Sequence, residues 1–271
     1  MSIIMKKQVF SFLIRLFLVL SVAIVFTVCF TSFAAQAIAK KNINVAQMEV
    51  KLVNLSIQQK TTIDKYKGQK PKFVYLTFDD GPNANTNEIL DILYKEDVTA
   101  TFFIIGSAVN ENSKNSIKRM ADEGHYIGAH SMTHNYQLLY DKKTYVNEMI
   151  KVQDIIENIT GIRNFLVRSP YGSQPGMVQD IRDDAVKNQI KIWDWTVDSL
   201  DWRLTGEPDA IVENIKKQVK NDREVILLHD RETTVKALPD IIHYLREEGY
   251  IFKAYNENEH FMVNFWNDAR L

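Results

Sequence analysis

Five groups of polar residues in this 271-residue chain carry side chains that catalysis uses. They are Asp79-Asp80, His130 with His134, Arg168, Asp198 with Asp201, and His229. Carboxylates and imidazoles exchange protons and bind divalent metals, and a guanidinium pairs with carboxylates. Each group comes after an apolar run that predicts a short strand. Because the carboxyl ends of neighbouring parallel strands meet at one rim, we expect the five groups to share one site.

Two adjacent carboxylates, Asp79 and Asp80, follow the apolar run 73–78 and precede Gly81-Pro82. Neighbouring side chains of a regular strand point to opposite faces, so both carboxylates can face one cleft only where the strand bends. We expect Gly81 to permit that bend because it lacks a Cβ atom. Taken alone, Asp-Asp-Gly is more typical of an ordinary acidic turn. The other four groups favour the interpretation as a site.

His130 and His134 stand four residues apart. In a helical turn, that spacing would place both imidazoles on one side, where their nitrogens can meet one metal ion. Asp80 as a third ligand would complete a set of two histidines and one carboxylate. Such a set leaves positions open for water and substrate, as catalytic zinc sites require. The histidine pair alone is weak evidence for a metal site.

The remaining groups can supply a base and an acid. Asp79 lies beside the expected ligand Asp80, and pairing with Arg168 would lower its pKa and fix its orientation. His229 titrates in the range that a general acid needs, and Asp201 could hold its tautomer. Each residue also has an ordinary interpretation, a surface arginine or a turn-capping aspartate. Their joint occurrence favours the catalytic one.

A tetrahedral oxyanion needs hydrogen-bond donors. In the stretch Arg168-Ser169-Pro170-Tyr171, Pro170 has no N–H group. We therefore expect the backbone N–H of Tyr171, or of a residue after it, to serve as the donor.

In this order, the five groups resemble the motifs of the polysaccharide deacetylases of carbohydrate esterase family four, the NodB-homology domain. The matching stretches are Thr77-Phe78-Asp79-Asp80-Gly81, His130-Ser131-Met132-Thr133-His134, Arg168-Ser169-Pro170-Tyr171, Asp198-Ser199-Leu200-Asp201-Trp202 and Leu227-Leu228-His229. The resemblance covers residues 71–253 and shows no departure at a position that the family uses for catalysis.

The resemblance implies hydrolysis of the N-acetyl group of an amino sugar, with release of acetate. It also implies one divalent metal ion, zinc in most members and cobalt, nickel or manganese in some. By position, Asp79 matches the base, Arg168 its partner, His229 the acid and Asp201 the partner of the acid, whereas Asp80, His130 and His134 match the metal ligands. Tyr171 matches the oxyanion donor, Trp202 and Leu227 match the walls of the groove and acetyl pocket, and Ser131 matches a hydroxyl that braces the histidine loop.

Short apolar runs alternate with helical patterns from residue 73 onwards. Strands are expected at 73–78, 100–105, 126–128, 165–167, 190–193, 224–228 and 251–253, and helices at 86–96, 107–123, 142–158, 177–188, 208–221 and 233–248. This alternation predicts an α/β fold with a parallel sheet and helices outside it, either open or closed into a barrel. With the resemblance, we expect a distorted (β/α) barrel of about seven parallel strands behind an N-terminal signal or anchor helix.

We expect four parts along the chain. They are a signal peptide or transmembrane anchor at 1–39, a polar stalk at 40–71, the deacetylase domain at 72–255 and a C-terminal tail at 256–271. Lys6, Lys7 and Arg15 precede the uncharged stretch 16–33, which is close to the length that spans a bilayer, and Ala37 suits cleavage. Basic residues before an apolar stretch predict that the N-terminus lies inside the cell and that the residues after the stretch lie outside it.

The composition restricts the partners of the exported part. The whole chain has a net charge of −1, which becomes −4 when residues 1–37 are removed. A negative charge argues against nucleic acid or an anionic membrane surface as the main partner. The membrane is an expected partner only through an uncleaved N-terminal segment. The only cysteine, Cys29, allows no internal disulfide. The oligomeric state is left open by the sequence.

We expect an enzyme of the bacterial cell envelope, anchored or secreted, that deacetylates N-acetylglucosamine in peptidoglycan. Other acetylated glycans stay open as substrates: chitin oligomers, an exopolysaccharide, N-acetylmuramic acid or O-acetyl xylan. A catalytically silent glycan-binding protein is the alternative from another class, although the metal ligands and the base are all present. In the tail, Phe261, Phe265 and Trp266 are expected either to pack on the barrel or to extend a sugar-binding surface.

Overall fold

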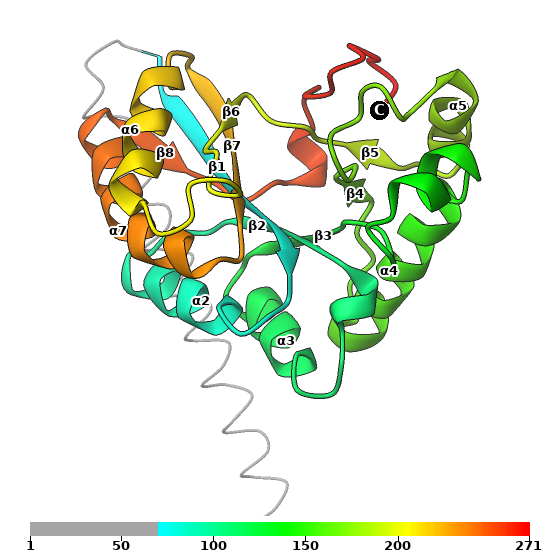
Figure 1. The fold of residues 1–271 in the computed structure, drawn as a ribbon, viewed down its shortest axis with the longest axis horizontal. Coiled ribbons are helices and arrows are strands. Elements are labelled where there is room, and N and C mark those ends of the chain that lie inside the picture. The colour runs from blue at the N-terminus through cyan, green and yellow to red at the C-terminus, as the bar shows by residue number, and fades with distance from the viewer. Residues whose placement is uncertain (1–69) are drawn as a thin grey trace, which may run out of the picture. The chain divides into compact units, whose positions relative to one another are not determined.

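Strands and helices alternate along residues 70–271, the part of the chain that the computed structural model describes (Figure 1). In chain order they are β1 (Lys72–Gly81), α2 (Thr86–Lys95), β2 (Thr101–Ile104), η1 (Gly106–Ala108), α3 (Lys114–Asp122), β3 (Tyr126–Ala129), η2 (Gln137–Asp141), α4 (Tyr145–Thr160), β4 (Leu166–Val167), α5 (Gln179–Lys187), β5 (Lys191–Ile192), β6 (Val197–Asp198), α6 (Pro208–Gln218), β7 (Arg223–His229), α7 (Glu232–Glu247), β8 (Tyr250–Phe252) and η3 (Glu257–Glu259).

The predicted signal or anchor segment, 1–39, and the stalk as far as residue 69 lie outside the described residues. Within residues 70–271, no helix has the length and apolar character needed to cross a membrane. These residues, including the segment 256–271, form one compact unit.

The strands form one parallel sheet in the order β5-β4-β3-β2-β1-β7-β6, and β8 pairs with the first residues of β1. The helices lie around the outside of the curled sheet (Figure 1). The outermost strands of this order, β5 and β6, do not pair with each other, so the barrel is open between them. The predicted α/β fold, a distorted barrel of about seven parallel strands, is confirmed.

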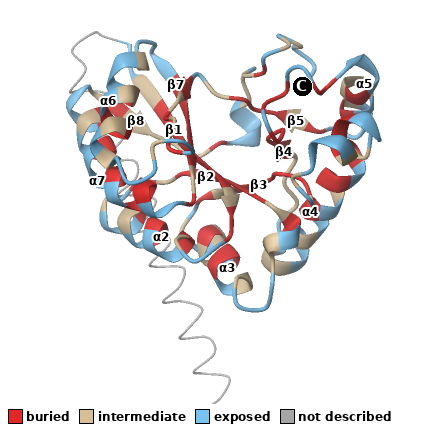
Figure 2. Ribbon diagram, in the orientation of Figure 1, coloured by how far each residue is buried: buried red, intermediate tan, exposed pale blue. Residues whose placement is uncertain are grey.

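The two faces of the sheet have separate cores. Alternate residues of β1, Val74, Leu76 and Phe78, belong to the larger apolar cluster together with helix residues. Tyr75, on the other face, joins a smaller cluster that includes Trp193. Figure 2 shows that buried residues are concentrated along the sheet and on the helix faces turned toward it. Because side chains alternate along a strand, the next inward positions after Tyr75 are residues 77 and 79.

The predicted helix 107–123 is wrong in its first part. The chain forms the short helix η1, then a turn, and only then α3. In the turn, the side-chain carbonyl of Asn110 accepts the backbone N–H groups of Asn112 and Ser113 at 2.9 and 3.2 Å. Asparagine side chains that bond to nearby backbone in this way compete with helix formation.

Strand β6 was not expected from the sequence. Its two residues, Val197 and Asp198, pair with Ile226 and Leu227 of β7. A two-residue strand has no run of alternating apolar residues, and only its place beside β7 makes it a strand. It brings the group Asp198–Trp202 to the rim directly, whereas the sequence had assigned that group to a loop after 190–193.

Candidate functional site

The polar groups predicted to share a site lie at the carboxyl ends of neighbouring strands. Asp79 on β1 is the register partner of His229 on β7. Arg168, directly after β4, donates its backbone N–H to Ala129 at the end of β3, next to His130. The side chains of Asp79, His130, Arg168 and His229 therefore come from the ends of four strands, β1, β3, β4 and β7, with β2 between β3 and β1.

Strand β1 brings both of its carboxylates to the site through a bulge. Asp79 pairs with Phe103 and Gly81 with Ile104, so Asp80 is an extra residue between two paired positions. Asp80 has a φ of 70°, and a bulge of this kind re-aims the side chains beside it. The bend that the sequence predicted therefore lies within β1, which continues to Gly81, rather than after its end.

The expected reason for Gly81 is corrected. The left-handed conformation belongs to Asp80, and Gly81 is absent from the residues with positive φ in the described chain. A Cβ atom at position 81 would instead lie 2.5 Å from Oδ2 of Asp230. Gly81 is needed because this carboxylate, on the residue after β7, packs directly against its Cα atom.

Asp80, His130 and His134 are placed to hold a metal ion. Their ligand atoms all lie within 4.8 Å of one another. Asp80 Oδ1 lies 3.6 Å from Nε2 of His130 and 3.5 Å from Nε2 of His134. Within the described chain, this buried oxygen has no hydrogen-bond partner. A buried carboxylate oxygen without a partner is costly, and a divalent cation would satisfy it, so the residues fit a metal.

The hydrogen bonds of His130 suit a metal ligand. Its Nδ1 atom lies 2.8 Å from the backbone carbonyl of Arg168. A carbonyl only accepts, so Nδ1 carries the proton and the lone pair of Nε2 points toward Asp80. Burial lowers the pKa of His130 to about 3, and the imidazole is therefore neutral, as a metal ligand must be.

The segment between the two histidines is not the helical turn that their spacing predicted. Ser131 and His134 have φ values of 66° and 50°, in the left-handed region. The Ser131 hydroxyl accepts the His134 backbone N–H at 2.9 Å. The buried carboxylate of Glu148, on α4, accepts the Thr133 N–H at 3.0 Å and the Thr133 hydroxyl at 2.9 Å. No motif marks Glu148, which lies on a helix outside the five groups.

Arg168 is wholly buried and is not a surface arginine. Nη1 donates to Asp79 Oδ1 at 3.0 Å and to the Thr77 hydroxyl at 2.5 Å. Nε donates to the carbonyl of Trp193 at 3.0 Å, and Nη2 donates to that of Asp194 at 2.7 Å. These four bonds fix the guanidinium, and through it one oxygen of Asp79, in a single orientation.

The pKa of Asp79 moves opposite to the expected direction. Burial raises the pKa of this carboxyl, and the nearby Arg168 guanidinium, which lowers it, offsets only part of that increase. The expectation from sequence considered Arg168 alone and could not include burial. A carboxyl with a raised pKa holds a proton more readily, which suits a general base.

Asp201 and His229 form a second buried pair. Asp201 Oδ1 accepts from Nδ1 of His229 at 2.7 Å, and Oδ2 accepts the His229 backbone N–H at 2.7 Å and the Thr234 hydroxyl at 2.6 Å. Burial lowers the pKa of His229. The hydrogen bond and charge of Asp201, together with the charges of Asp79 and Asp80, raise this pKa by more than burial lowers it. The net pKa is above its ordinary value, which favours a protonated imidazole.

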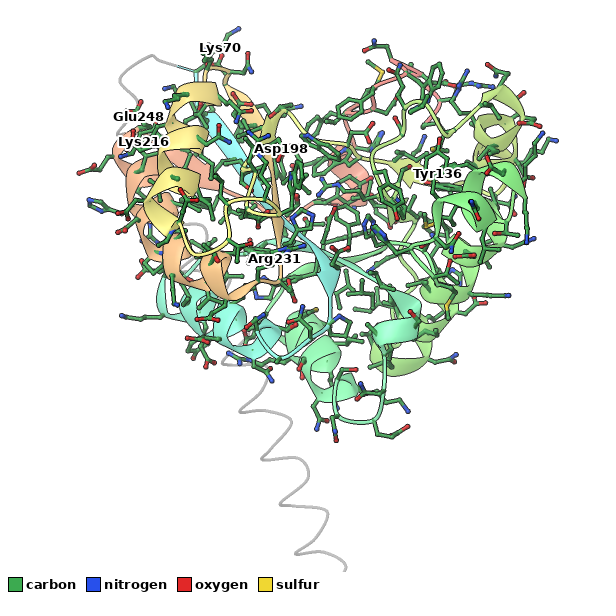
Figure 3. All side chains as sticks on the ribbon, viewed as in Figure 1. Lys70, Tyr136, Asp198, Lys216, Arg231 and Glu248 are labelled. Atoms are coloured by element: carbon green, nitrogen blue, oxygen red, sulfur yellow. The ribbon has the colours of Figure 1, made fainter. Side chains whose placement is uncertain are left out.

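Asp198 has the turn-capping role that was its ordinary interpretation. Its side chain accepts the Leu200 backbone N–H at 2.9 Å, and its carbonyl accepts from the Gln218 side chain at 2.7 Å. Asp198 is the last residue of β6 and is labelled in Figure 3.

Exposed aromatic side chains flank these buried groups. Tyr171 and Trp202 are 58% and 47% exposed. The Tyr171 hydroxyl donates to the His134 carbonyl at 2.9 Å, and its ring lies 4.7 Å from that of His134. Leu227, on the inward face of β7, is buried but belongs to neither apolar cluster. The Tyr171 N–H donates to no backbone carbonyl of residues 70–271.

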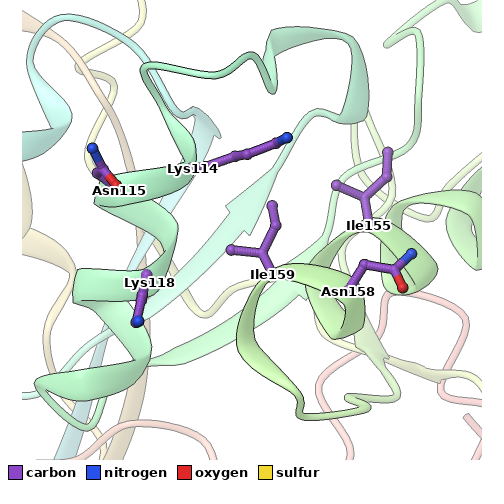
Figure 4. Close-up of a pocket in the computed structure, with 6 residues that line it drawn as sticks. All are labelled: Lys114, Asn115, Lys118, Ile155, Asn158 and Ile159. Carbon is purple, nitrogen blue, oxygen red and sulfur yellow. The ribbon is translucent and has the colours of Figure 1, made fainter.

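A separate hollow lies between α3 and α4 (Figure 4). Its lining includes Lys114, Lys118, Ile155 and Ile159, and it contains none of the predicted site residues.

Known proteins share both this sequence pattern and this fold. The polysaccharide deacetylase family model matches residues 66–192. A peptidoglycan-N-acetylglucosamine deacetylase of Bacillus cereus is 45% identical over 243 residues, which are 88% of each chain. This chain belongs to the polysaccharide deacetylase family.

Two further matches agree with the family. The solved structure of the polysaccharide deacetylase Bc1974 from Bacillus cereus is 46% identical, covers 74% of this chain and all of that chain, and superposes with a TM-score of 0.72. The peptidoglycan-N-acetylmuramic acid deacetylase PdaC of Bacillus subtilis is 36% identical over 214 residues, 78% of this chain and 43% of that protein. The deacetylase is thus a hydrolase of the family that the sequence predicted.

Proposed function

We propose that this deacetylase removes acetyl groups from N-acetylglucosamine residues of peptidoglycan and that it uses one divalent metal ion. Zinc is the first candidate for this ion, and cobalt, nickel and manganese are the alternatives. The observation that carries the proposal is the unpartnered buried oxygen of Asp80 between two histidine nitrogens, beside the Arg168–Asp79 pair. The choice of sugar is supported by the 45% identical relative that bears that activity in its name.

Asp80, His130 and His134 would hold the metal. When bound, a divalent cation supplies a Lewis acid that polarises water and the acetyl carbonyl. Asp79 is the base, and its Oδ2 atom takes the proton of the attacking water because Oδ1 is engaged by Arg168 at 3.0 Å. The new bond joins the water oxygen to the acetyl carbon, and the carbon–nitrogen bond of the amide then breaks.

His229 is the acid that protonates the departing amine. Its Nδ1 atom is engaged by Asp201 at 2.7 Å, so Nε2 is the nitrogen left to donate. The backbone N–H of Tyr171 stabilises the oxyanion, which is the largest single contribution in many acyl-transfer reactions. Leu227 lines the acetyl pocket, and Tyr171 and Trp202 are the aromatic surfaces for the sugar.

The placement of the enzyme follows from its substrate. We assign it to the outside of the cytoplasmic membrane, with residues 1–39 as signal peptide or anchor and residues 40–71 as the stalk. The boundaries 72–255 for the catalytic domain and 256–271 for the tail stay predictions.

A panel of substrates tests the choice of glycan. Acetate release by the purified chain is compared on N-acetylglucosamine oligomers, peptidoglycan, N-acetylmuramic acid-containing fragments, chitin oligomers and O-acetyl xylan. We expect the N-acetylglucosamine residues of peptidoglycan to react fastest. The match to PdaC makes N-acetylmuramic acid the second candidate. Faster release from any other substrate would contradict the assignment, and glycan binding without release from any of them would indicate a silent protein.

A further inference from the structure

Asp194, two residues after the end of β5, is a fully buried carboxylate outside the five groups. Its Oδ1 accepts the Ser173 backbone N–H at 2.8 Å. Its Oδ2 accepts the Ser173 hydroxyl at 2.5 Å and the Phe265 backbone N–H at 2.7 Å. This one side chain therefore joins Ser173 to Phe265, two residues that lie more than 90 positions apart along the chain.

The joined segments are the Tyr171 loop (residues 169–174) and the C-terminal segment (residues 261–271). They are also joined without Asp194. Trp266 Nε1 donates to the Ser173 carbonyl at 2.9 Å, and the Gln174 amide donates to the Phe265 carbonyl at 2.8 Å. A Cβ atom at Gly172 would lie 3.0 Å from the Phe265 ring, so the backbone of the loop packs closely against that side chain.

The Tyr171 loop needs such support because its backbone is strained. Tyr171 and Gly172 have φ values of 67° and 82°, two successive residues in the left-handed region. A non-glycine residue holds that conformation only where its surroundings fix it. Tyr171 carries the N–H that the proposed mechanism uses for the oxyanion.

The backbone of Asp194 also binds Arg168, the residue that pairs with the proposed base Asp79. Its carbonyl accepts Nη2 of Arg168 at 2.7 Å, and Nη1 of the same guanidinium binds Asp79 at 3.0 Å. The Asp194 N–H donates to the carbonyl of Val263 in the C-terminal segment at 2.5 Å. Asp194 thus contacts Arg168, the Tyr171 loop and the C-terminal segment.

We propose that Asp194 is a positioning residue of the deacetylation and that the C-terminal segment fixes the Tyr171 loop through it. The inference rests on the proposed function, because it assigns the loop to the oxyanion. It also gives a role to the aromatic residues 265 and 266, for which the sequence offered only packing or a sugar-binding surface.

Asp194→Asn is the sharpest test. Either orientation of the amide places its NH₂ group against a backbone N–H, that of Ser173 or that of Phe265, so one link to the loop or to the segment is lost. Misplacing a catalytic group by about 1 Å can cost about 100-fold in rate. We expect kcat to fall about 10- to 100-fold with KM almost unchanged, because an oxyanion donor acts only in the transition state.

Trp266→Phe is a milder second variant. It keeps an aromatic ring but removes the indole N–H that donates to Ser173 and part of the ring area, so we expect a smaller loss in kcat of the same kind. Glu224→Gln is the matched control. Glu224 is also fully buried and accepts from Thr196, Lys220 and Asn221, but it lies at the opposite end of β7 from His229. We expect it to lower stability and leave kcat of the folded enzyme intact.

Acetate release and amide hydrogen exchange are measured on all four full-length proteins at a temperature where circular dichroism shows them folded. We expect Asp194→Asn to lower kcat and to speed exchange in residues 169–174 more than Glu224→Gln does. Equal kcat for the two variants, or equal exchange in the loop, overturns the positioning role. If the wild-type protein releases no acetate from any glycan, the proposed function fails, and the exchange measurement still decides whether Asp194 fixes the loop.

Discussion

Among single residues, the buried carboxylates Asp79 and Asp201 belong to two ion pairs whose pKa shifts have different causes. Asp79 has a raised pKa because burial outweighs the lowering by Arg168. Asp201, which is also buried, accepts three hydrogen bonds and raises the pKa of His229. In the proposed mechanism, the first pair therefore supplies a base that can take a proton, and the second supplies an imidazole that keeps one.

Replacing Asp201 tests the second pair. The pKa of His229 is raised, so its proton is present below that pKa and is lost as the pH rises through it. Asp201→Asn removes the charge that raises this pKa, and we expect the alkaline limb of the kcat/KM profile to move to lower pH. General acid catalysis contributes about 100- to 10,000-fold, so we also expect kcat at pH 8 to fall at least about 100-fold.

The measurement is a pH profile of acetate release for the wild type, Asp201→Asn and the control Glu224→Gln. The control should keep the wild-type alkaline limb. An unmoved limb in Asp201→Asn would show that His229 is not the acid that Asp201 controls.

At the scale of elements, the bulge in β1 aims Asp80 at the two histidines. Its geometry depends on Gly81, because a Cβ atom there would lie 2.5 Å from Asp230 Oδ2. That oxygen also accepts the Thr86 hydroxyl at 2.5 Å, and the Asn83 side chain donates to the Asp230 carbonyl at 2.8 Å. Asp230 is therefore fixed and cannot move aside easily.

Gly81→Ala should therefore disturb the bulge. Overpacking a buried position costs about 1–3 kcal/mol, and we expect that loss in the free energy of unfolding together with weaker zinc binding. Gly161→Ala is the control. Gly161 has a φ of 75°, and no atom of residues 70–271 lies within 4 Å of an added Cβ. Alanine there strains only the end of α4 and should leave zinc binding unchanged. Urea unfolding and zinc titration measure both effects, and equal zinc affinities in the two variants would contradict the role of the bulge.

Elements with a strong local pattern could be predicted from the sequence, and those set by tertiary contacts could not. The apolar runs around Leu76 and Ile226 indicated buried strands, and the order of the five polar groups indicated a shared rim. Strand β6 needed β7 beside it. The left-handed conformations of Asp80 and Ser131 needed the bulge and the histidine loop. Asp194 stands among aromatic residues with no motif of its own, and its partners lie far along the chain.

At the scale of the whole molecule, the site is assembled by the end of the sheet. The carboxyl ends of β1, β3, β4, β6 and β7 each bring one polar group to the rim. The proposed metal ligands thus come from two strand ends, and a bound cation would link β1 to the loop after β3. Metal binding is therefore expected to stabilise the folded state.

Thermal unfolding tests that linkage. A ligand that binds only the folded state stabilises it by about 2.7 kcal/mol at 100 times its dissociation constant. We expect zinc to raise Tm by several degrees over the chelator-treated protein, and His130→Ala to abolish the increase. His243→Ala, at an exposed site on α7, should keep it. An equal rise in Tm for His130→Ala would place the zinc elsewhere.

Metal-dependent deacetylation with Asp79 as the base is tested by acetate release from N-acetylglucosamine oligomers by the purified chain. The protein is stripped of metal, assayed, and assayed again after one equivalent of zinc, with Asp79→Asn in parallel. We expect turnover only by the zinc-loaded wild type. Turnover by the stripped wild type at the same rate, or normal turnover by Asp79→Asn, would contradict it.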